Sequence, residues 1–103
     1  MTNDEKIIAL LRYALNKSGV SHDSYFIGTK SEFGARLDAK CMFRNSDGTW
    51  CVMWHERGNF KLLGEFPTIS LAANYLYWSR LWQKMPTLYD YLDEWERETG
   101  EVM

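Results

Sequence analysis

Carboxylates and aromatic rings gather in the last eighteen residues, and they are the side chains best placed to do chemistry. Residues 86–103 hold six acids and one base, whereas residues 1–85 hold eight acids and eleven bases. The charge is therefore about +3 up to residue 85 and about −5 beyond it. An acidic segment with interleaved aromatics is typical of a surface that meets a basic partner. The six carboxylates are Asp90, Asp93, Glu94, Glu96, Glu98 and Glu101.

The net charge favours a protein as that partner. At −2 overall, the chain lacks the basic footprint that binding to nucleic acid requires, so no direct nucleic-acid contact is expected. Aromatic residues make up 16% of the chain, and tyrosine and tryptophan are the types that anchor protein interfaces. The alternative interpretation is that the acids form the ordinary solvated face of an outermost helix.

A histidine, an aspartate and a cysteine fall on one face of a predicted hairpin. Asp38 is expected opposite His55, close enough for the carboxylate to orient the imidazole as a general base. Cys51 lies four residues from His55 on the same strand, roughly 13 Å away at about 3.3 Å per residue, which is too far for a thiolate–imidazole pair. We therefore expect a cross-strand surface pair and predict neither a catalytic residue nor an enzyme.

Metal and cofactor sites are not predicted. His22 and His55 are far apart in the sequence, and neither belongs to a cluster of cysteine and histidine ligands. Gly28 and Gly34 bracket a loop that fits neither GxGxxG nor GxxxxGK[ST], the two common phosphate-binding patterns.

Length and composition predict a single domain over residues 1–103, since 46% hydrophobic residues suffice for one core. Cys41 and Cys51 have neither metal-ligand spacing nor the density of a disulfide framework, so we expect reduced thiols in a cytoplasmic protein. The sequence has no apolar run of eighteen residues and begins with acids rather than the bases of a signal peptide. Neither a membrane span nor export is expected.

The first half of the chain predicts a helix followed by strands. An apolar stripe at helical spacing begins after a cap at Asn3 or Asp4 and ends at Gly19. A polar turn then leads to a short strand at residues 25–28 and a loop at residues 28–34. The residues of the apolar stripe are Ile7, Ile8, Leu11, Ala14 and Leu15.

Two alternating segments, residues 36–44 and 49–56, predict a hairpin around a turn of four residues. A further strand at residues 60–66 follows a tight turn, which gives an antiparallel meander of three to four strands. The predicted cross-strand pairs, all facing the core, are Phe43 with Trp50, Cys41 with Val52, and Ala39 with Trp54.

Two helices are predicted after the sheet. The first begins at a cap on Thr68 or Ser70 and runs to about residue 82 or 84, with a side of small residues that can lie against the sheet. Pro86 breaks it, and Thr87 fits the start of the last helix. The fold class is therefore α+β, an antiparallel meander with an N-terminal helix and two C-terminal helices packed mainly on one face. The small-residue side comprises Ala72, Ala73, Leu76 and Ser79, and the bulky side Tyr75, Trp78 and Trp82.

Two motifs resemble one family. The strand and turn at residues 50–58 (WCVMWHERG) and the helix at residues 66–81 (FPTISLAANYLYWSRL) are similar to segments of the small immunity proteins of bacterial polymorphic toxin and contact-dependent growth inhibition systems. The resemblance covers about residues 49–82, a third of the chain. It implies a cytosolic protein that binds one cognate toxin domain and blocks its active site or substrate approach. Such toxins are often basic nucleases, which agrees with the acidic C-terminal segment.

If the chain is such an inhibitor, carboxylates would take the place of the phosphates that a basic nuclease binds, and aromatics would anchor the contact. Trp95 could equally belong to the core, because it shares a helix face with Leu88 and Leu92, whereas Tyr89 faces away from them. The residues predicted to steer the partner are Asp90, Asp93, Glu94 and Glu98, and the predicted anchors are Tyr89, Trp95 and Trp82.

Three other functions stay open. One is a small adaptor domain that binds a protein or peptide on its sheet edge. Another is a small enzyme that uses His55 and Asp38. The third is a homodimer built on exposed aromatic helices, which is compatible with each of the others.

Overall fold

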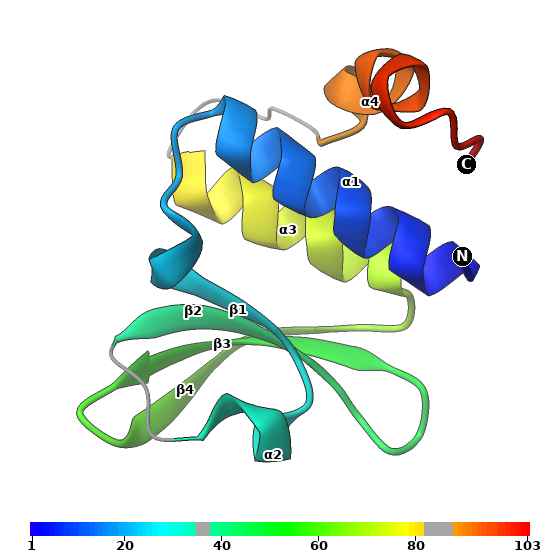
Figure 1. Cartoon of the computed structure of the whole chain (residues 1–103). Helices are drawn as coiled ribbons and strands as arrows, with labels where there is room; N and C mark the ends of the chain where they lie inside the picture. The colour runs from blue at the N-terminus through cyan, green and yellow to red at the C-terminus, as the bar shows by residue number, and fades with distance from the viewer. Residues whose placement is uncertain (35–37, 82–87) are drawn as a thin grey trace.

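The computed structural model describes residues 1–34, 38–81 and 88–103 (Figure 1). Its elements confirm the predicted α+β class, with an N-terminal helix, a four-stranded sheet and two C-terminal helices. In chain order they are α1 (Asn3–Lys17), η1 (His22–Ser24), β1 (Tyr25–Gly28), α2 (Lys30–Phe33), β2 (Ala39–Arg44), β3 (Trp50–Glu56), β4 (Asn59–Phe66), α3 (Ile69–Leu81), η2 (Leu88–Tyr91) and α4 (Leu92–Thr99).

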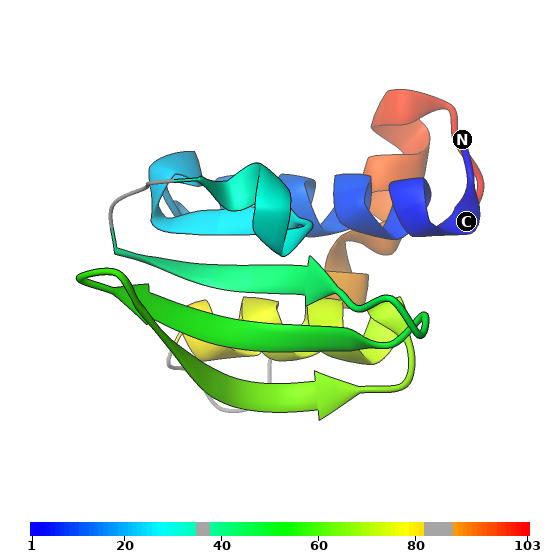
Figure 2. The same cartoon turned by 90° about the horizontal axis from the view of Figure 1, so that it is seen from below.

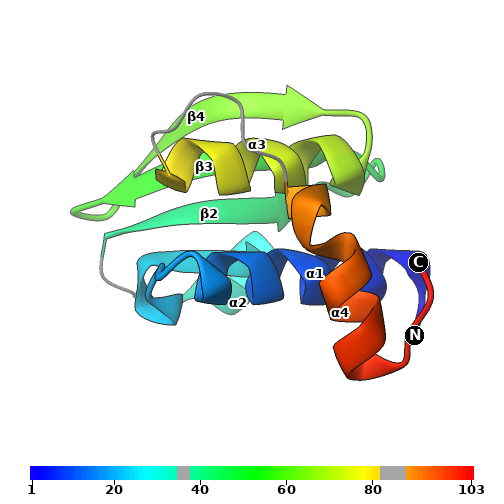
Figure 3. The same ribbon diagram turned by 90° about the horizontal axis from the view of Figure 1, so that it is seen from above.

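The helices lie mainly on one face of the sheet. α1 and α3 lie side by side over that face, and α4 crosses α1 on the side away from the sheet (Figures 1 and 3). The short helix α2 lies on the opposite, outer face, where Figure 2 leaves β3 and β4 in open view. Among the described residues, no helix is both long and apolar enough to cross a membrane.

The strand order is β1-β2-β3-β4, and β2, β3 and β4 form the predicted antiparallel meander. β1 pairs with β2 in parallel, so the antiparallel meander comprises three of the four strands. Parallel neighbours need a connection that crosses the sheet rather than a tight turn. α2 belongs to this connection and carries the buried Phe33 across the outer face.

α1 begins with a capping box. The Thr2 hydroxyl accepts a hydrogen bond from the Glu5 backbone N–H at 3.1 Å, and the Glu5 carboxylate accepts from the Thr2 backbone N–H at 3.3 Å. The hydrogen bonds from Thr2 lower the pKa of the Glu5 carboxyl. The N-cap is therefore Thr2, just before the predicted Asn3 or Asp4. The Thr2–Glu5 pair satisfies two backbone N–H groups that have no partner within the helix.

The hairpin register differs from the prediction by one residue. Phe43 does not pair with Trp50, because the turn is one residue shorter than the predicted four. The Asn45 N–H donates to the Thr49 carbonyl at 2.8 Å, which makes these two the last pair and leaves three residues in the loop. Gly48, with a φ of 87°, takes the left-handed position that such a loop requires. The observed pairs are Arg44 with Trp50, Met42 with Val52, and Lys40 with Trp54.

This shift turns β2 over, since a slip of one residue moves every side chain to the other face. Trp50 and Val52 face the helices as predicted, and Met42 joins them instead of facing outward. The predicted inward positions of Ala39, Cys41 and Phe43 are wrong, because all three lie in the outer cluster together with Phe33 and Cys51.

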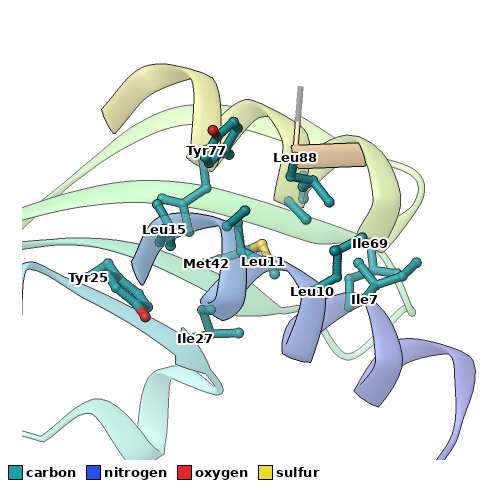
Figure 4. Close-up of a cluster of buried hydrophobic side chains, with 14 of the residues drawn as sticks. Ile7, Leu10, Leu11, Leu15, Tyr25, Ile27, Met42, Ile69, Tyr77 and Leu88 are labelled. Carbon is teal, nitrogen blue, oxygen red and sulfur yellow. The ribbon is translucent and has the colours of Figure 1, made fainter. Parts of the chain in front are cut away.

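The main core lies between the sheet and the helices (Figure 4). The small side of α3 packs there as predicted, and its alanines are fully buried. The predicted end of this helix and the predicted cap at Thr87 lie outside the described residues. Buried members of the main core include Ile7, Leu10, Leu11, Leu15, Tyr25, Ile27, Met42, Ile69, Ala72, Ala73, Leu76, Tyr77, Leu88 and Trp95.

Candidate protein-binding surface

The acidic C-terminal segment is held on the protein by its apolar side. Leu88 is fully buried and Trp95 is only 2% exposed, so both belong to the main core. Tyr91 and Leu92 are half-buried and pack against the same core. α4 ends at Gly100, whose φ of 74° is the left-handed conformation of a helix C-cap. Because these contacts fix one side of η2 and α4, most of the acids are turned outward.

We use the name acidic surface for Asp90, Asp93, Glu94 and Glu98. Asp90, Asp93 and Glu98 are exposed, and Glu94 is half-buried. Within the described part of the chain, none of the four forms an ion pair. Uncompensated carboxylates on a fixed helix produce a local negative potential that attracts a cationic surface.

Glu94 and Glu98 lie one helical turn apart and close to Tyr13 of α1. Burial, together with the neighbouring carboxylates of Glu94 and Glu98, raises the pKa of the Tyr13 hydroxyl well above its ordinary value. The Tyr13 ring also packs edge-on against Tyr91, with 6.2 Å between centroids, and the Lys17 ammonium lies 5.5 Å from its centroid. Tyr13 therefore links the orientation of α4 to α1.

The other two acids are used within the chain. The Glu96 carboxylate accepts a hydrogen bond from the Met103 backbone N–H at 2.9 Å. Lys6 donates to the Val102 carbonyl at 2.6 Å and lies 3.9 Å from the Glu101 carboxylate. These contacts tie the last residues to the start of α1, so Glu96 and Glu101 are less available to a partner than Asp90 and Asp93.

The predicted aromatic anchors are not equivalent. Trp95 lies beneath the acidic surface, where it supports the helix and offers little area to a partner. Tyr89 is half-buried, and its hydroxyl forms a hydrogen bond with the Ser70 hydroxyl of α3. Trp82 lies outside the described residues. Of the three, Tyr89 is therefore the aromatic ring that the described structure places at the edge of the acidic surface.

The predicted pairing of Asp38 with His55 is wrong. His55 lies opposite Ala39 and is 7% exposed, packed against Phe33 and Phe60 with ring centroids 4.9 and 4.7 Å away. The Asp38 carboxylate instead accepts a hydrogen bond from the Arg57 backbone N–H at 3.3 Å. The shifted register is the cause, since it places Ala39 rather than Asp38 opposite the histidine.

The remaining polar side chains of the outer cluster are also enclosed. Burial raises the pKa of the Cys51 thiol, which donates a long contact of 3.6 Å to the Asn45 side-chain oxygen. In the described ranges, no group of three or more His, Cys, Asp or Glu side chains could hold a metal ion.

Two surface features were missed in the sequence. One is a hollow of about 640 Å³ where the start of α1 meets the β1–α2 turn and the β2–β3 hairpin, lined partly by Ile8, Trp50 and Arg44. The other is Leu71, which is 53% exposed on α3 and adds to the predicted bulky side with Tyr75 and Trp78. The spacing of four and three residues between them was the available signal, because it places all three on one helix face.

Comparison with known proteins finds no family model, no characterised protein and no solved structure that matches this chain.

Proposed function

We propose that this chain is an immunity-type inhibitor, a small cytoplasmic protein that binds and neutralises a toxin domain with a basic surface, such as a nuclease. The observation that carries the proposal is the placement of the acidic surface on a helix whose other side is buried. The carboxylates are thereby held in a fixed array rather than on a free tail. A fixed array can meet a complementary array of bases without first losing conformational entropy.

The proposed mechanism is occlusion. A nuclease binds phosphates with lysine and arginine side chains, and carboxylates spaced along α4 would occupy the same cationic groups. Asp90 and Asp93 are suited to first contact because both are exposed and without an ion pair among the described residues. Glu94 and Glu98 extend the array by one turn beside Tyr13. Such charges mainly raise the association rate, by about 10- to 1,000-fold in steered complexes, and fall in effect as salt rises.

The aromatic contribution is assigned differently from the sequence-based prediction. Tyr89, at the edge of the acidic surface, is the proposed anchor, because a half-buried tyrosine can add contact area at small entropic cost. Trp95 is proposed as a positioning residue, which acts by holding α4 in place from the core side.

An adaptor function is the second candidate, and the free edge of the sheet favours it. β4 is a terminal strand of eight residues, so one side of its backbone has no strand neighbour in the described sheet. An extended peptide could add a strand there. This surface carries both Lys61 and Glu65 and therefore has no preference for a basic partner.

The test is co-purification of the tagged chain with the product of the adjacent gene, followed by a salt titration of the complex. The double variant Asp90→Lys with Asp93→Lys is expected to weaken binding by at least about tenfold, and the salt dependence should become shallower. The matched control is Asp23→Lys with Glu56→Lys, which makes the same charge change at exposed positions outside both α4 and β4.

Equal weakening by both double variants would show that only net charge matters and would contradict the assigned surface. A complex that is insensitive to both variants and to salt would move the contact to another face, with β4 as the first candidate. Absence of any complex would contradict the proposed inhibitor function.

A further inference from the structure

We infer that the basic partner of the proposed function also contacts the exposed side of α3, so that acids and apolar side chains form one binding face. The apolar part is the α3 ridge, which we define as Leu71, Tyr75 and Trp78. Leu71 is 53% and Trp78 is 41% exposed. The inference rests on the proposed function and deepens it, because it names the surface that the partner must present: basic groups beside an apolar patch.

The ridge is an uninterrupted apolar surface. Tyr75 packs against Trp78 with 6.1 Å between ring centroids and against Phe66 of β4 with 5.2 Å. α3 has no charged residue between Ile69 and Ser79. Contiguous exposed apolar side chains mark interaction sites more often than scattered ones do, but they select no particular partner. The selection has to come from the groups that border the ridge.

Two hydrogen bonds hold η2 against α3. The Leu88 backbone N–H donates to the Asn74 side-chain oxygen at 3.1 Å. The Tyr89 hydroxyl forms a hydrogen bond with the Ser70 hydroxyl. Figure 3 shows this segment, in orange, beginning beside α3 and leading into α4. η2 is therefore fixed along one side of α3.

The helical spacing of α3 places the ridge next to η2. Trp78 follows Asn74 by one helical turn and therefore lies in the same row of side chains. Leu71 follows Ser70 directly along the helix. Asp90, the first residue of the acidic surface, is exposed on η2. The acidic surface and the α3 ridge therefore adjoin each other at η2.

Charge selects the occupant and the direction in which the contact extends. Asp90 is exposed and has no ion pair among the described residues, so it attracts a base. On the α1 side of α4, Arg12 and Lys17 are exposed, and these bases would repel a basic partner. The ridge on the α3 side carries no charge of either sign. A partner drawn to Asp90 therefore extends over α3 rather than over α1.

The size of an interface requires such an extension. A standard interface involves about 20–30 residues on each partner. η2 and α4 have four and eight residues, and Leu88 and Trp95 among them are buried. The acidic surface alone is therefore too small for a stable complex, and the α3 ridge supplies adjoining apolar area.

The two parts of the face contribute differently to binding. Carboxylates act over a distance and mainly raise the association rate. Apolar side chains act only on contact, and tryptophan is among the residues that most often dominate the binding energy. Burial of Trp78 and Leu71 under the partner therefore slows dissociation. A partner that fits this face presents lysine or arginine side chains next to an apolar patch.

Binding kinetics test this division. The product of the adjacent gene is immobilised on a sensor, and the unchanged chain and its variants are passed over it. Leu71→Ser with Trp78→Ser should raise the dissociation rate at least about tenfold and change the association rate less than about twofold, because neither substitution alters the charge. Asp90→Lys with Asp93→Lys should instead lower the association rate at least about tenfold at low salt. The matched control for Leu71→Ser is Leu62→Ser, since Leu62 is 49% exposed on the outer sheet face, and its kinetics should equal those of the unchanged chain.

The outcomes separate the inference from the proposed function. An unchanged dissociation rate in Leu71→Ser with Trp78→Ser would overturn the inference, while weakening by Asp90→Lys with Asp93→Lys would leave the proposed function in place. Equal acceleration of dissociation by Leu62→Ser would also overturn the inference, because the effect would not belong to α3. Absence of any complex would contradict both. Circular dichroism confirms that each variant retains the helix content of the unchanged chain.

A solvent-sensitive dye tests the contact directly. Acrylodan is attached to Leu71→Cys chains and, as the control, to Leu62→Cys chains. The native Cys41 and Cys51 are buried and should not react in the folded protein. Addition of the partner should shift the emission of the label at position 71 to shorter wavelength and leave the label at position 62 unchanged.

Two results of the dye experiment would overturn the inference. The absence of a shift at position 71 with the partner bound would show that the partner leaves α3 uncovered. A shift that appears when the concentration of the labelled chain alone is raised would assign the α3 ridge to a second copy of this chain.

Discussion

The two C-terminal helices each bury one side and expose sides of opposite chemistry. α3 covers the sheet with small and apolar residues and exposes an uncharged ridge with Leu71 and Trp78. α4 buries Trp95 and exposes carboxylates. Neither exposed side is needed to fill the core, so packing alone does not explain the difference. Under the proposed function, the exposed side of α4 contacts a basic partner, whereas Leu71 and Trp78 of α3 carry no charge with which to attract one.

The helices also differ in how strongly the fold holds them. α3 has thirteen residues and packs against both the sheet and α1. α4 has eight residues, and isolated helices shorter than about 12–15 residues are marginal in water. Its place therefore depends on few buried side chains, chiefly Trp95 and the preceding Leu88. The acidic surface is positioned by the core, although none of its carboxylates is part of the core.

The largest expected effect is on the free energy of unfolding, and it differs between the tryptophans of α4 and α3. Trp95→Ala should lower the free energy of unfolding by about 3–5 kcal/mol, because it leaves a cavity beneath α4. Trp78→Ala should lower it by less than about 1 kcal/mol, since that side chain is 41% exposed. Urea denaturation followed by far-ultraviolet circular dichroism measures both. Similar losses in the two variants would contradict the assignment of Trp95 as support and Trp78 as surface.

The fold was predictable where local patterns act alone. The apolar stripe of α1, the small residues of α3 and the alternation in β3 each indicated the correct element and most of its buried side. The hairpin register was not predictable, because it depends on whether Asn45 pairs with Thr49 or remains in the loop. That choice rests on one backbone hydrogen bond and the left-handed Gly48, yet it reverses every side chain of β2.

The candidate site shows the same limit. Charge counting in the sequence located the acidic segment. It could not show which of the six carboxylates bond to other parts of the chain and which face solvent. Glu96 accepts a hydrogen bond from the nearby chain end, whereas Glu101 pairs with Lys6, which lies almost one hundred positions away in the sequence. The pairing of Asp38 with His55 failed with the register on which it depended. Only the three-dimensional structure shows which side chains are buried and which distant residues are in contact.

A smaller effect on stability is expected from Tyr13 of α1, which lies beside the carboxylates of α4. The pKa of Tyr13 is raised in the folded protein, so its contribution to stability is complete below about pH 10 and is lost as pH rises further. Tyr13→Phe should therefore make the alkaline loss of stability shallower. Thermal unfolding between about pH 8 and pH 11 measures this difference.

The carboxylates on α4 provide the control for the Tyr13 prediction. Glu94→Gln and Glu98→Gln should each lower the pKa of Tyr13 toward its ordinary value, which the absorbance of tyrosinate reports. Asp93→Asn, on the same helix, should leave it unchanged. If all three variants act alike, the general negative potential of α4 controls Tyr13, and no specific placement of Glu94 and Glu98 is needed.

The smallest expected effect on stability concerns the residues that matter most for the proposed partner. Asp90→Asn and Asp93→Asn should each change the free energy of unfolding by less than about 0.5 kcal/mol, because both side chains are exposed and unpaired within the described residues. Removing carboxylates from a −5 segment should slightly relieve repulsion. Chemical denaturation at low and high salt measures the difference, which should shrink as salt screens the repulsion. A loss above about 1 kcal/mol would mean that these acids stabilise the fold. The contrast between α3 and α4 could then be explained by stability alone, without a binding partner.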